Sequence, residues 1–360
     1  MLFFLAGVLI PCVRAQRQSP VESPQDPKLI PRASDEGRLG QRISIDVVVA
    51  DASGNPVPGI GQQFFTLLDN QQPKPLYSFQ AVLGAQATPP DTAILLIDLV
   101  NTPAKDVAAE QTQLVAFLRQ NHGYLSMPTS IVVLGDEGLT IGHPSLDGNA
   151  LAANLGAMMD KPRTLVAKYG WAAPVYQRRL SDAALNEMVR SEHSKPGRKL
   201  LIWIGPGWFV APSDPHDVLV RQQVGSPDPV AMLDDLAERA AGLRAARITL
   251  YNINPVPVKD DPNRGFDYRK FLAPVTTPSQ LQDGNRSLPV LAIESGGLVL
   301  RSTSDLAGDM QKCLTDASAY YTLIFDRPPA TAPDEYHSIS VQVNRPGVTV
   351  RTRHGYYSTP

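Results

Sequence analysis

A continuous apolar run at residues 93–97 constrains the fold of this chain more than any other feature of its sequence. The run Ala-Ile-Leu-Leu-Ile ends on Asp98, and a polar segment with a helical pattern follows it. A strand that is apolar at every position is buried on both faces, which is typical of a parallel sheet covered by helices. In such sheets, ligands bind beyond the carboxyl ends of the strands. Asp98 therefore lies where an α/β fold places its functional groups.

Further apolar runs predict more strands of the same sheet. Buried strands are expected at residues 130–134, 200–204 and 247–253, with amphipathic helices between them. This alternation predicts a doubly wound, mostly parallel sheet with right-handed crossovers over residues 91–316. Residues 254–286 have no clear periodicity, and so long a loop inside a compact domain is either functional or disordered.

Alternating apolar and polar residues at both ends of the chain predict a second, β-rich part. Short strands are expected within residues 41–84 and again within residues 317–358. Neither piece can bury a two-sided core by itself. We therefore expect one discontinuous β-sandwich, built from both segments, that carries the α/β block as an insertion.

The beginning of the chain resembles an export signal. Residues 1–15 contain a short apolar run followed by small residues, and residues 16–40 are rich in Pro, Ser, Gln and charge. The run is shorter than the ~20 residues that a membrane span needs. We expect a cleaved signal peptide, a disordered tether and an exported protein, periplasmic or extracellular, with no transmembrane helix in the mature chain.

Charge and cysteine content narrow the class of protein further. The 360 residues carry a formal net charge of −2 with both signs interspersed, which argues against a nucleic-acid partner. The cysteines are Cys12, which export would remove, and Cys313, which lies in a helical pattern. A single remaining cysteine cannot form an internal disulfide. We expect Cys313 to be a small buried hydrophobic residue.

Six short motifs follow one another along residues 40–358. They are DVVVADASGNPV from Asp46, FTLLDN from Phe65, GRKLLIW from Gly197, AIESGG from Ala292, YYTL from Tyr320 and RTRHGYY from Arg351. Their order resembles that of the secreted proteins related to the von Willebrand factor A domain that are abundant in acidobacteria. The resemblance implies a secreted interaction module rather than an enzyme.

The resemblance also implies where a divalent cation would lie. Cation-binding A domains use an Asp-x-Ser-x-Ser loop after the first strand, a Thr from a second loop and an Asp after a later strand. Asp98 matches the first Asp and Thr102 the second Ser, whereas Val100 stands where the first Ser is expected. Ser145 or Asp147 falls near the second loop.

The third position of the implied cation site falls in Gly205-Pro-Gly207, which has no carboxylate. Hard cations need oxygen ligands, so we expect no cofactor, or Mg²⁺ or Mn²⁺ held only weakly. Asp98 and Thr102 can instead cap the helix that follows them. The candidate binding residues at this edge are Asp98, Asn101, Thr102, Ser145, Asp147, Gly205, Gly207 and Trp208.

The motifs of common enzymes are missing from the sequence. It contains no Gly-x-Ser-x-Gly elbow, no Gly-x-Gly-x-x-Gly, no phosphate-binding loop and no His-Glu-x-x-His. The sequence predicts a non-catalytic binding protein that contacts a protein or cell-envelope surface. The alternatives are a cation-dependent adhesion module that uses Asp98, Thr102 and Asp147, and a hydrolase that these motifs do not detect.

Overall fold

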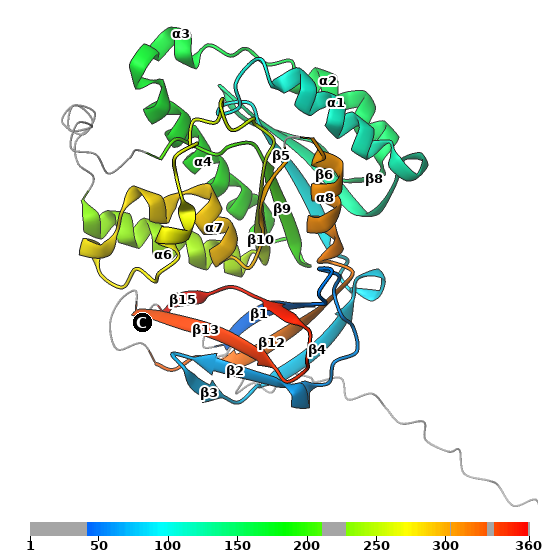
Figure 1. Ribbon diagram of the computed structural model, residues 1–360, viewed down its shortest axis with the longest axis vertical. Coiled ribbons are helices and arrows are strands. Elements are labelled where there is room, and N and C mark those ends of the chain that lie inside the picture. The colour runs from blue at the N-terminus through cyan, green and yellow to red at the C-terminus, as the bar shows by residue number, and fades with distance from the viewer. Residues whose placement is uncertain (1–41, 211–227, 303, 330–334, 359–360) are drawn as a thin grey trace, which may run out of the picture. The chain divides into compact units, whose positions relative to one another are not determined.

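The computed structural model describes residues 42–210, 228–302, 304–329 and 335–358, which form a mixed α/β sheet and two small antiparallel sheets (Figure 1). The fold class predicted from the sequence is therefore confirmed. The predicted signal peptide and tether, residues 1–40, lie outside the described residues.

The central sheet is mostly parallel. Its described strands follow the order β11, β10, β9, β5, β6, β7, and β8 also pairs with β6. Their bounds are β5 (Thr92–Asp98), β6 (Tyr124–Gly135), β7 (Gly138–Ile141), β8 (Ser145–Asp147), β9 (Lys199–Ile204), β10 (Ile248–Asn254) and β11 (Val299–Arg301). Strands β7 and β8 run antiparallel to β6, whereas the others run parallel to their neighbours.

Helices cover both faces of this sheet. One face packs against α1 (Val107–Leu118), α2 (Gly148–Met159) and α8 (Leu306–Thr315), and the other against α3 (Leu165–Tyr169), α4 (Ala173–His193), α6 (Pro229–Ala245) and α7 (Leu288–Glu294). Leu95 and Ile97 of β5 face the first group, while Ile94 and Leu96 face the second. Both sides of the strand are therefore buried, which explains its uninterrupted apolar sequence. Cys313 is buried in α8, as expected.

The two antiparallel sheets each combine strands from both ends of the chain. One has the order β14, β1, β12, β4 and the other β15, β13, β2, β3. Their bounds are β1 (Arg42–Ala50), β2 (Phe65–Asp69), β3 (Gln72–Lys74), β4 (Ser78–Leu83), β12 (Ala319–Asp326), β13 (Glu335–Val343), β14 (Thr349–Arg351) and β15 (Gly355–Ser358). Ile45 pairs with Leu323 across β1 and β12, and both side chains join a core shared with Leu67 and Val341 of the second sheet. The sandwich thus closes only when both chain segments are present.

The segment between β10 and α7 is ordered rather than disordered. It contains the short 3₁₀ helices η7 (Tyr268–Phe271), η8 (Pro278–Gln280) and η9 (Asp283–Arg286). Its conformation is held by polar contacts, such as the bond from Asn285 Nδ2 to the carbonyl of Phe271 (3.1 Å). Contacts of this kind leave no apolar periodicity in a sequence. The sequence also did not predict α3, because this helix is too short to show a helical repeat.

Charged residues of the sequence motifs meet where the sandwich touches the central sheet. Arg198 is buried beside β9, donates to the carbonyl of Asp316 (3.1 Å) and lies over the ring of Tyr320 (4.7 Å). The Asp316 carboxylate accepts two bonds from Arg351 (2.7 and 2.6 Å) and one from the Tyr251 hydroxyl (2.7 Å). These contacts hold the two parts of the fold together.

A second carboxylate completes this junction. Asp46 of β1 accepts from Arg247 (3.1 Å) and from the hydroxyl of Thr322 (2.8 Å), and it forms an ion pair with Arg198 (3.9 Å). Four of the six motifs therefore contribute to a single charged network. Their role in this structure is to join the sandwich to the α/β part.

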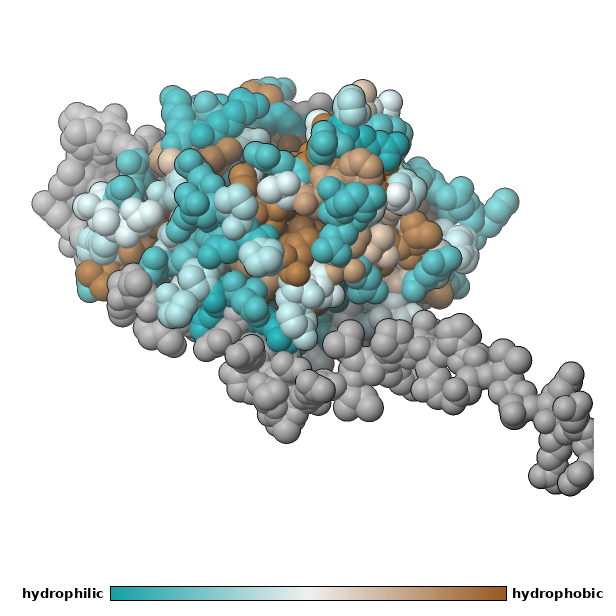
Figure 2. Space-filling model, turned by 90° about the horizontal axis from the view of Figure 1, so that it is seen from below, coloured by the Kyte–Doolittle hydropathy of each residue, from teal (hydrophilic) through white to brown (hydrophobic). Residues whose placement is uncertain are grey.

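Polar and apolar residues are mixed on the face that Figure 2 shows. Seen from the sandwich side, hydrophilic and hydrophobic residues alternate where grey atoms do not cover them (Figure 2). No helix in the described ranges has the length and apolar character that crossing a membrane requires. Scattered apolar residues, such as those on the face in Figure 2, are ordinary for a solvated surface.

Candidate functional site

Asp98 lies at the carboxyl end of β5, as the sequence predicted, but its carboxylate is used by its own chain. Oδ1 accepts the backbone N–H of Asn101 (2.9 Å), and Oδ2 accepts both the Asn101 side-chain amide (2.8 Å) and the Trp203 indole N–H (2.9 Å). The carboxylate therefore ties the turn after β5 to strand β9.

The same turn is fastened to helix α4. The side-chain amide of Asn101 also donates to Ser181 Oγ (2.9 Å), and Gln177 Nε2 donates to the carbonyl of Val100 (2.8 Å). Asn101 thus connects Asp98 to the helix that covers this face of the sheet. In this arrangement Asn101 is a structural link rather than a free surface group.

Asp98 is fully buried, which shapes its electrostatics. Burial raises the pKa of Asp98, and the hydrogen bonds from Asn101 and Trp203 act in the opposite direction. Glu110 of α1 lies nearby, is 2 % exposed, and neither of its carboxyl oxygens has a hydrogen-bond partner among the described residues. Burial and the charge of Asp98 hold the pKa of Glu110 well above its usual range. Two acidic side chains, Asp98 and Glu110, therefore lie near the carboxyl end of β5 without access to solvent.

Sequence reasoning missed Glu110, although a signal for it exists. Glu110, Leu114, Phe117 and Leu118 are the buried residues of α1. Their spacing of four, three and one residues marks a single helix face. A carboxylate on the apolar face of a predicted amphipathic helix therefore identifies a buried acid.

Gly205 and Gly207 allow the loop after β9 to lie directly against this region. Gly205 has φ +144°, and a Cβ there would lie 2.7 Å from Cβ of Asp98 and 3.3 Å from Oγ1 of Thr102. Gly207 has φ +69°, and a Cβ there would lie 2.9 Å from Leu288. Both positions require glycine because the loop packs closely in a left-handed conformation. The loop closes over Asp98 and Thr102, which are both buried.

Ser145 and Asp147 do not belong to this end of the sheet, so their placement in the candidate site was wrong. They lie in β8, where Ser145 pairs with Thr129 and Asp147 with Tyr124 at the amino end of β6. Asp98 pairs with Leu134 at the opposite end of β6. Asp147 instead caps α2 by accepting the backbone N–H groups of Asn149 and Ala150. The antiparallel strands that follow β6 carry the chain back down the sheet, which a parallel pattern did not anticipate.

The residues at the carboxyl end do not fit a divalent cation. Mg²⁺ prefers six oxygens in octahedral geometry. The Asp98 oxygens already accept N–H groups, Val100 has no side-chain oxygen, and the Gly205-Pro-Gly207 loop adds no carboxylate. Among the described residues, the buried oxygens near Asp98 without a partner include the Thr102 hydroxyl and both carboxyl oxygens of Glu110, and burial favours the protonated form of Glu110. Within those ranges no cluster of three or more His, Cys, Asp or Glu side chains could hold a metal ion.

Trp208 is buried and does not form a contact patch at the surface. Its ring packs edge-on against Trp203, with 5.9 Å between the ring centroids. The exposed tryptophan at this end of the sheet is Trp171, in η5 (Gly170–Ala172) directly after α3. Trp171 and Val166 are each 67 % exposed. No local pattern in the sequence indicates which of the three tryptophans is exposed.

Two contacts place α3 beside the carboxyl end of the sheet. Asp136, which follows β6, accepts the backbone N–H of Leu165 (3.2 Å) through its side chain. Arg163, just before α3, donates to the backbone carbonyl of Thr102. Val166 and Trp171 therefore belong to a segment whose first residues contact the carboxyl end of the sheet.

Comparisons with known proteins give only distant structural likeness. No family model matches the sequence, and no curated protein matches it at a significant level. A pilus adhesin of Lactobacillus rhamnosus GG is similar over 86% of this chain and 49% of its own, with 9% identity and a TM-score of 0.32. A human COPII-coat protein is similar over 75% of this chain and 44% of its own, with 10% identity and a TM-score of 0.33.

A third structure, the pilus tip protein Mfa5 of Porphyromonas gingivalis, is similar over 76% of this chain and 52% of its own, with 12% identity and a TM-score of 0.22. This chain thus spans about half the length of each of the three proteins. With scores this low, the matches do not establish a common family.

Proposed function

We propose that this chain is an exported, non-catalytic binding protein that contacts a protein or cell-envelope partner at the carboxyl end of its central sheet without a metal ion. The observation that carries the proposal is the exposure of Trp171 and Val166, in the segment that Arg163 joins to the turn after β5. A few buried aromatic anchors supply most of the energy of a protein interface, and tryptophan is prominent among them. Trp171 is the anchor that we assign to this surface.

The burial of the acidic groups supports binding rather than catalysis. A general acid or base has to come within hydrogen-bond reach of its substrate. Asp98 and Glu110, two carboxyl groups at the carboxyl end of β5, are closed off from solvent. The saturated hydrogen bonding of Asp98 also supports contact without a cation.

The sequence motifs support membership of the secreted proteins related to the von Willebrand factor A domain. Asp46, Arg198, Tyr320 and Arg351 come from four different motifs and take part in one charged network. A shared set of residues that joins two parts of a fold is a reason for those motifs to occur together. The signal-like residues 1–15 support export.

The test compares what immobilised forms of the protein retain from a cell-envelope extract in the presence of EDTA. The forms are the wild type, Trp171→Ala, and Tyr124→Ala as a matched control. Tyr124 is 69 % exposed and lies at the amino end of β6, away from the proposed surface. We expect one retained partner that Trp171→Ala binds at least about tenfold more weakly, because a hot-spot residue contributes ~2 kcal/mol or more. Tyr124→Ala should bind like the wild type.

Two results would contradict this proposal. One is a partner that is retained only with Mg²⁺, which would favour the cation-dependent adhesion module. The other is equal retention by Trp171→Ala and the wild type, which would place the contact surface elsewhere. If the protein instead hydrolyses a retained molecule and the Asp98→Asn variant does not, the hydrolase alternative is supported.

A further inference from the structure

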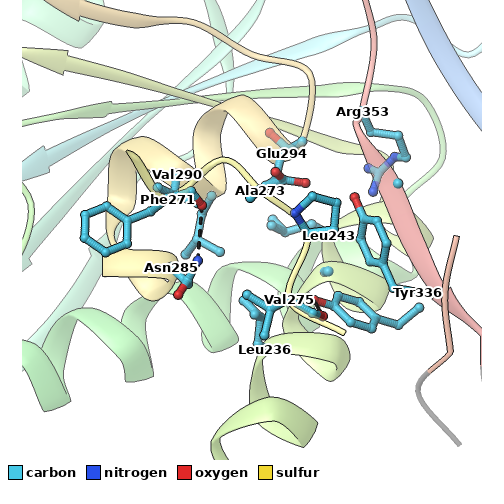
Figure 3. Close-up of a pocket in the computed structure, with 16 residues that line it drawn as sticks. Leu236, Leu243, Phe271, Ala273, Val275, Asn285, Val290, Glu294, Tyr336 and Arg353 are labelled. Atoms are coloured by element: carbon cyan, nitrogen blue, oxygen red, sulfur yellow. Dashed lines mark hydrogen bonds between the residues drawn. The ribbon is translucent and has the colours of Figure 1, made fainter. Parts of the chain in front are cut away.

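A pocket lies where the α/β part meets the sandwich. It is bounded by α6, α7, residues 271–275 and the strands β13 and β15 (Figure 3). The empty space within it is ≈ 560 Å³, including the part that is open to solvent. Most of the wall is apolar and includes Leu236 and Leu243 from α6 and Val290 from α7. Small-molecule sites are typically concave and apolar, with a few polar groups that fix orientation.

The wall of the pocket is fixed by hydrogen bonds before any ligand binds. The Tyr357 hydroxyl donates to the carbonyl of Val275 (3.1 Å), and Asn285 donates to the carbonyl of Phe271 (3.1 Å). Gly355 lets the ring of Tyr336 lie against the strand, because a Cβ there would be 2.3 Å from the Tyr336 hydroxyl. A preformed wall lowers the entropy cost of ordering the site on binding.

Arg353 places a positive charge at one end of this pocket. Figure 3 shows its guanidinium beside the Tyr336 ring and on the same side as Glu294, with Phe271 and Asn285 at the other end. The side chain is 8 % exposed and has no hydrogen bond or ion pair with any of the described residues. Burial and the nearby Arg244 lower the pKa of Arg353 to about 10, so it remains protonated at neutral pH.

Nearby groups do not neutralise this charge fully. Arg244 on α6 also has a buried Nε without a partner among the described residues. Asp46 and Glu294 both act on the charge of Arg353, but Asp46 is already paired with Arg198 and Arg247. Glu294 lies in the pocket wall, and its Oε1 is 3.5 Å from Nδ1 of His354, a contact that raises the pKa of His354. The surroundings of Arg353 therefore favour an anion, while Glu294 disfavours a doubly charged one.

We propose that this pocket binds a small amphipathic monocarboxylate, with the carboxylate paired to Arg353 and the apolar chain against α6 and α7. The planar guanidinium presents two parallel N–H groups that match a carboxylate. The Tyr336 hydroxyl stays protonated because burial raises its pKa, so it can donate a further bond. This site is separate from the surface around Trp171 and does not depend on the function proposed for it.

The probe for this proposal is octanoate, measured by titration calorimetry against the full chain near neutral pH. We expect one molecule to bind with a Kd below ~1 mM. Octan-1-ol, which lacks the charge, should bind roughly 10- to 100-fold more weakly, because a hydrogen bond to a charged group contributes ~1.5–3 kcal/mol. Octyl phosphate should also bind more weakly than octanoate. Equal or tighter binding of either compound would overturn the assignment of a monocarboxylate.

Two variants locate the binding site. Arg353→Met keeps an unbranched apolar side chain without the charge and should weaken octanoate binding at least tenfold, whereas Arg269→Met, at a highly exposed arginine outside the pocket, should have no effect. Ala240 of α6 also lines the pocket, so Ala240→Phe should block it while Arg353 remains, which keeps the test valid if Arg353→Met fails to fold. Unchanged octanoate binding by Ala240→Phe contradicts the proposal. Trp171→Ala should bind octanoate as the wild type does, which separates this test from that of the contact surface.

Discussion

The carboxyl end of the central sheet and the junction pocket each contain a buried charged residue, but the two residues are used in opposite ways. At the carboxyl end, Asp98 is surrounded by donors from Asn101 and Trp203. In the pocket, Arg353 has no partner among the described residues. The first charge stabilises the fold, whereas the second is left for a ligand.

The difference shows that the position of a charged residue in a fold predicts a binding site less well than its lack of hydrogen-bond partners does. An uncompensated buried charge destabilises a protein. Proteins tolerate such local costs mainly at functional sites. The two arginines of the motif that begins at Arg351 show the same difference. Arg351 forms a bidentate ion pair with Asp316, whereas Arg353 has no such partner among the described residues.

The largest expected effect comes from removing the paired arginine. Arg351→Met leaves the buried Asp316 carboxylate without its main counter-charge, which we expect to lower the free energy of unfolding by ~3–5 kcal/mol. Urea denaturation measures this change. Arg269→Met, at a highly exposed arginine, is the control and should change the value by less than ~0.5 kcal/mol. A loss below ~1 kcal/mol for Arg351→Met would show that the junction does not depend on this pair.

The next effect tests whether Asp98 is structural. Asp98→Ala leaves the buried N–H groups of Trp203 and Asn101 without acceptors, and each such group costs ~1–3 kcal/mol. We expect a loss of ~2–4 kcal/mol in chemical denaturation. Asp147→Ala removes only an exposed helix cap and should cost ~1 kcal/mol. If the two variants are equally stable, Asp98 is not a structural group.

Arg353→Met should have a small effect on stability and so complete the comparison. It removes a buried charge that has no partner, so we expect the free energy of unfolding to rise, or to fall by no more than ~1 kcal/mol. The same denaturation experiment applies. A loss as large as that of Arg351→Met would mean that Arg353 is also a structural residue, and the contrast between the two arginines would fail.

Divalent cations should hardly change the melting temperature. A ligand that binds the native state stabilises it by RT ln(1 + [L]/Kd). With the Asp98 oxygens occupied, we expect millimolar Mg²⁺ or Mn²⁺ to shift the melting temperature by less than ~1 °C, where ~1 kcal/mol corresponds to ~2–4 °C for a domain of 150–250 residues. A shift of several degrees that Asp98→Ala abolishes would favour the cation-dependent alternative.

A further small effect is a pH dependence from His354. Its hydrogen bond to Glu294 raises the pKa of His354 above the ordinary value of 6.5. The resulting stabilisation is fully present below pH 6.5 and is lost as the pH rises through the folded-state pKa. The pair is half-exposed, so we expect ~0–1 kcal/mol. The difference in urea midpoint between the wild type and His354→Gln should shrink as the pH rises. Growth of that difference with pH would contradict the ion pair.

The sequence predicted the sheets better than the site. Burial on both faces makes β5 uninterruptedly apolar, and burial on one face makes residues near Ile45 alternate, so both patterns are visible in the sequence. The placement of Asp147 depends on β8 running antiparallel to β6, which no local pattern encodes. The exposure of Trp171 and the missing partner of Arg353 depend on which distant elements pack around them. Such properties require the assembled structure.

The interleaving of the two chain ends also sets an order of events during synthesis. Asp46 and Thr322 face each other across β1 and β12, yet they are 276 positions apart. A ribosome adds ~5–20 residues per second, so β1 is synthesised roughly 14–55 s before its partner strand β12. The parallel sheet, with strands between Thr92 and Arg301, can assemble within that time. Until the last strands emerge, β1 has unpaired edges that can join strands of other nascent chains, so the yield of folded protein depends on keeping them apart.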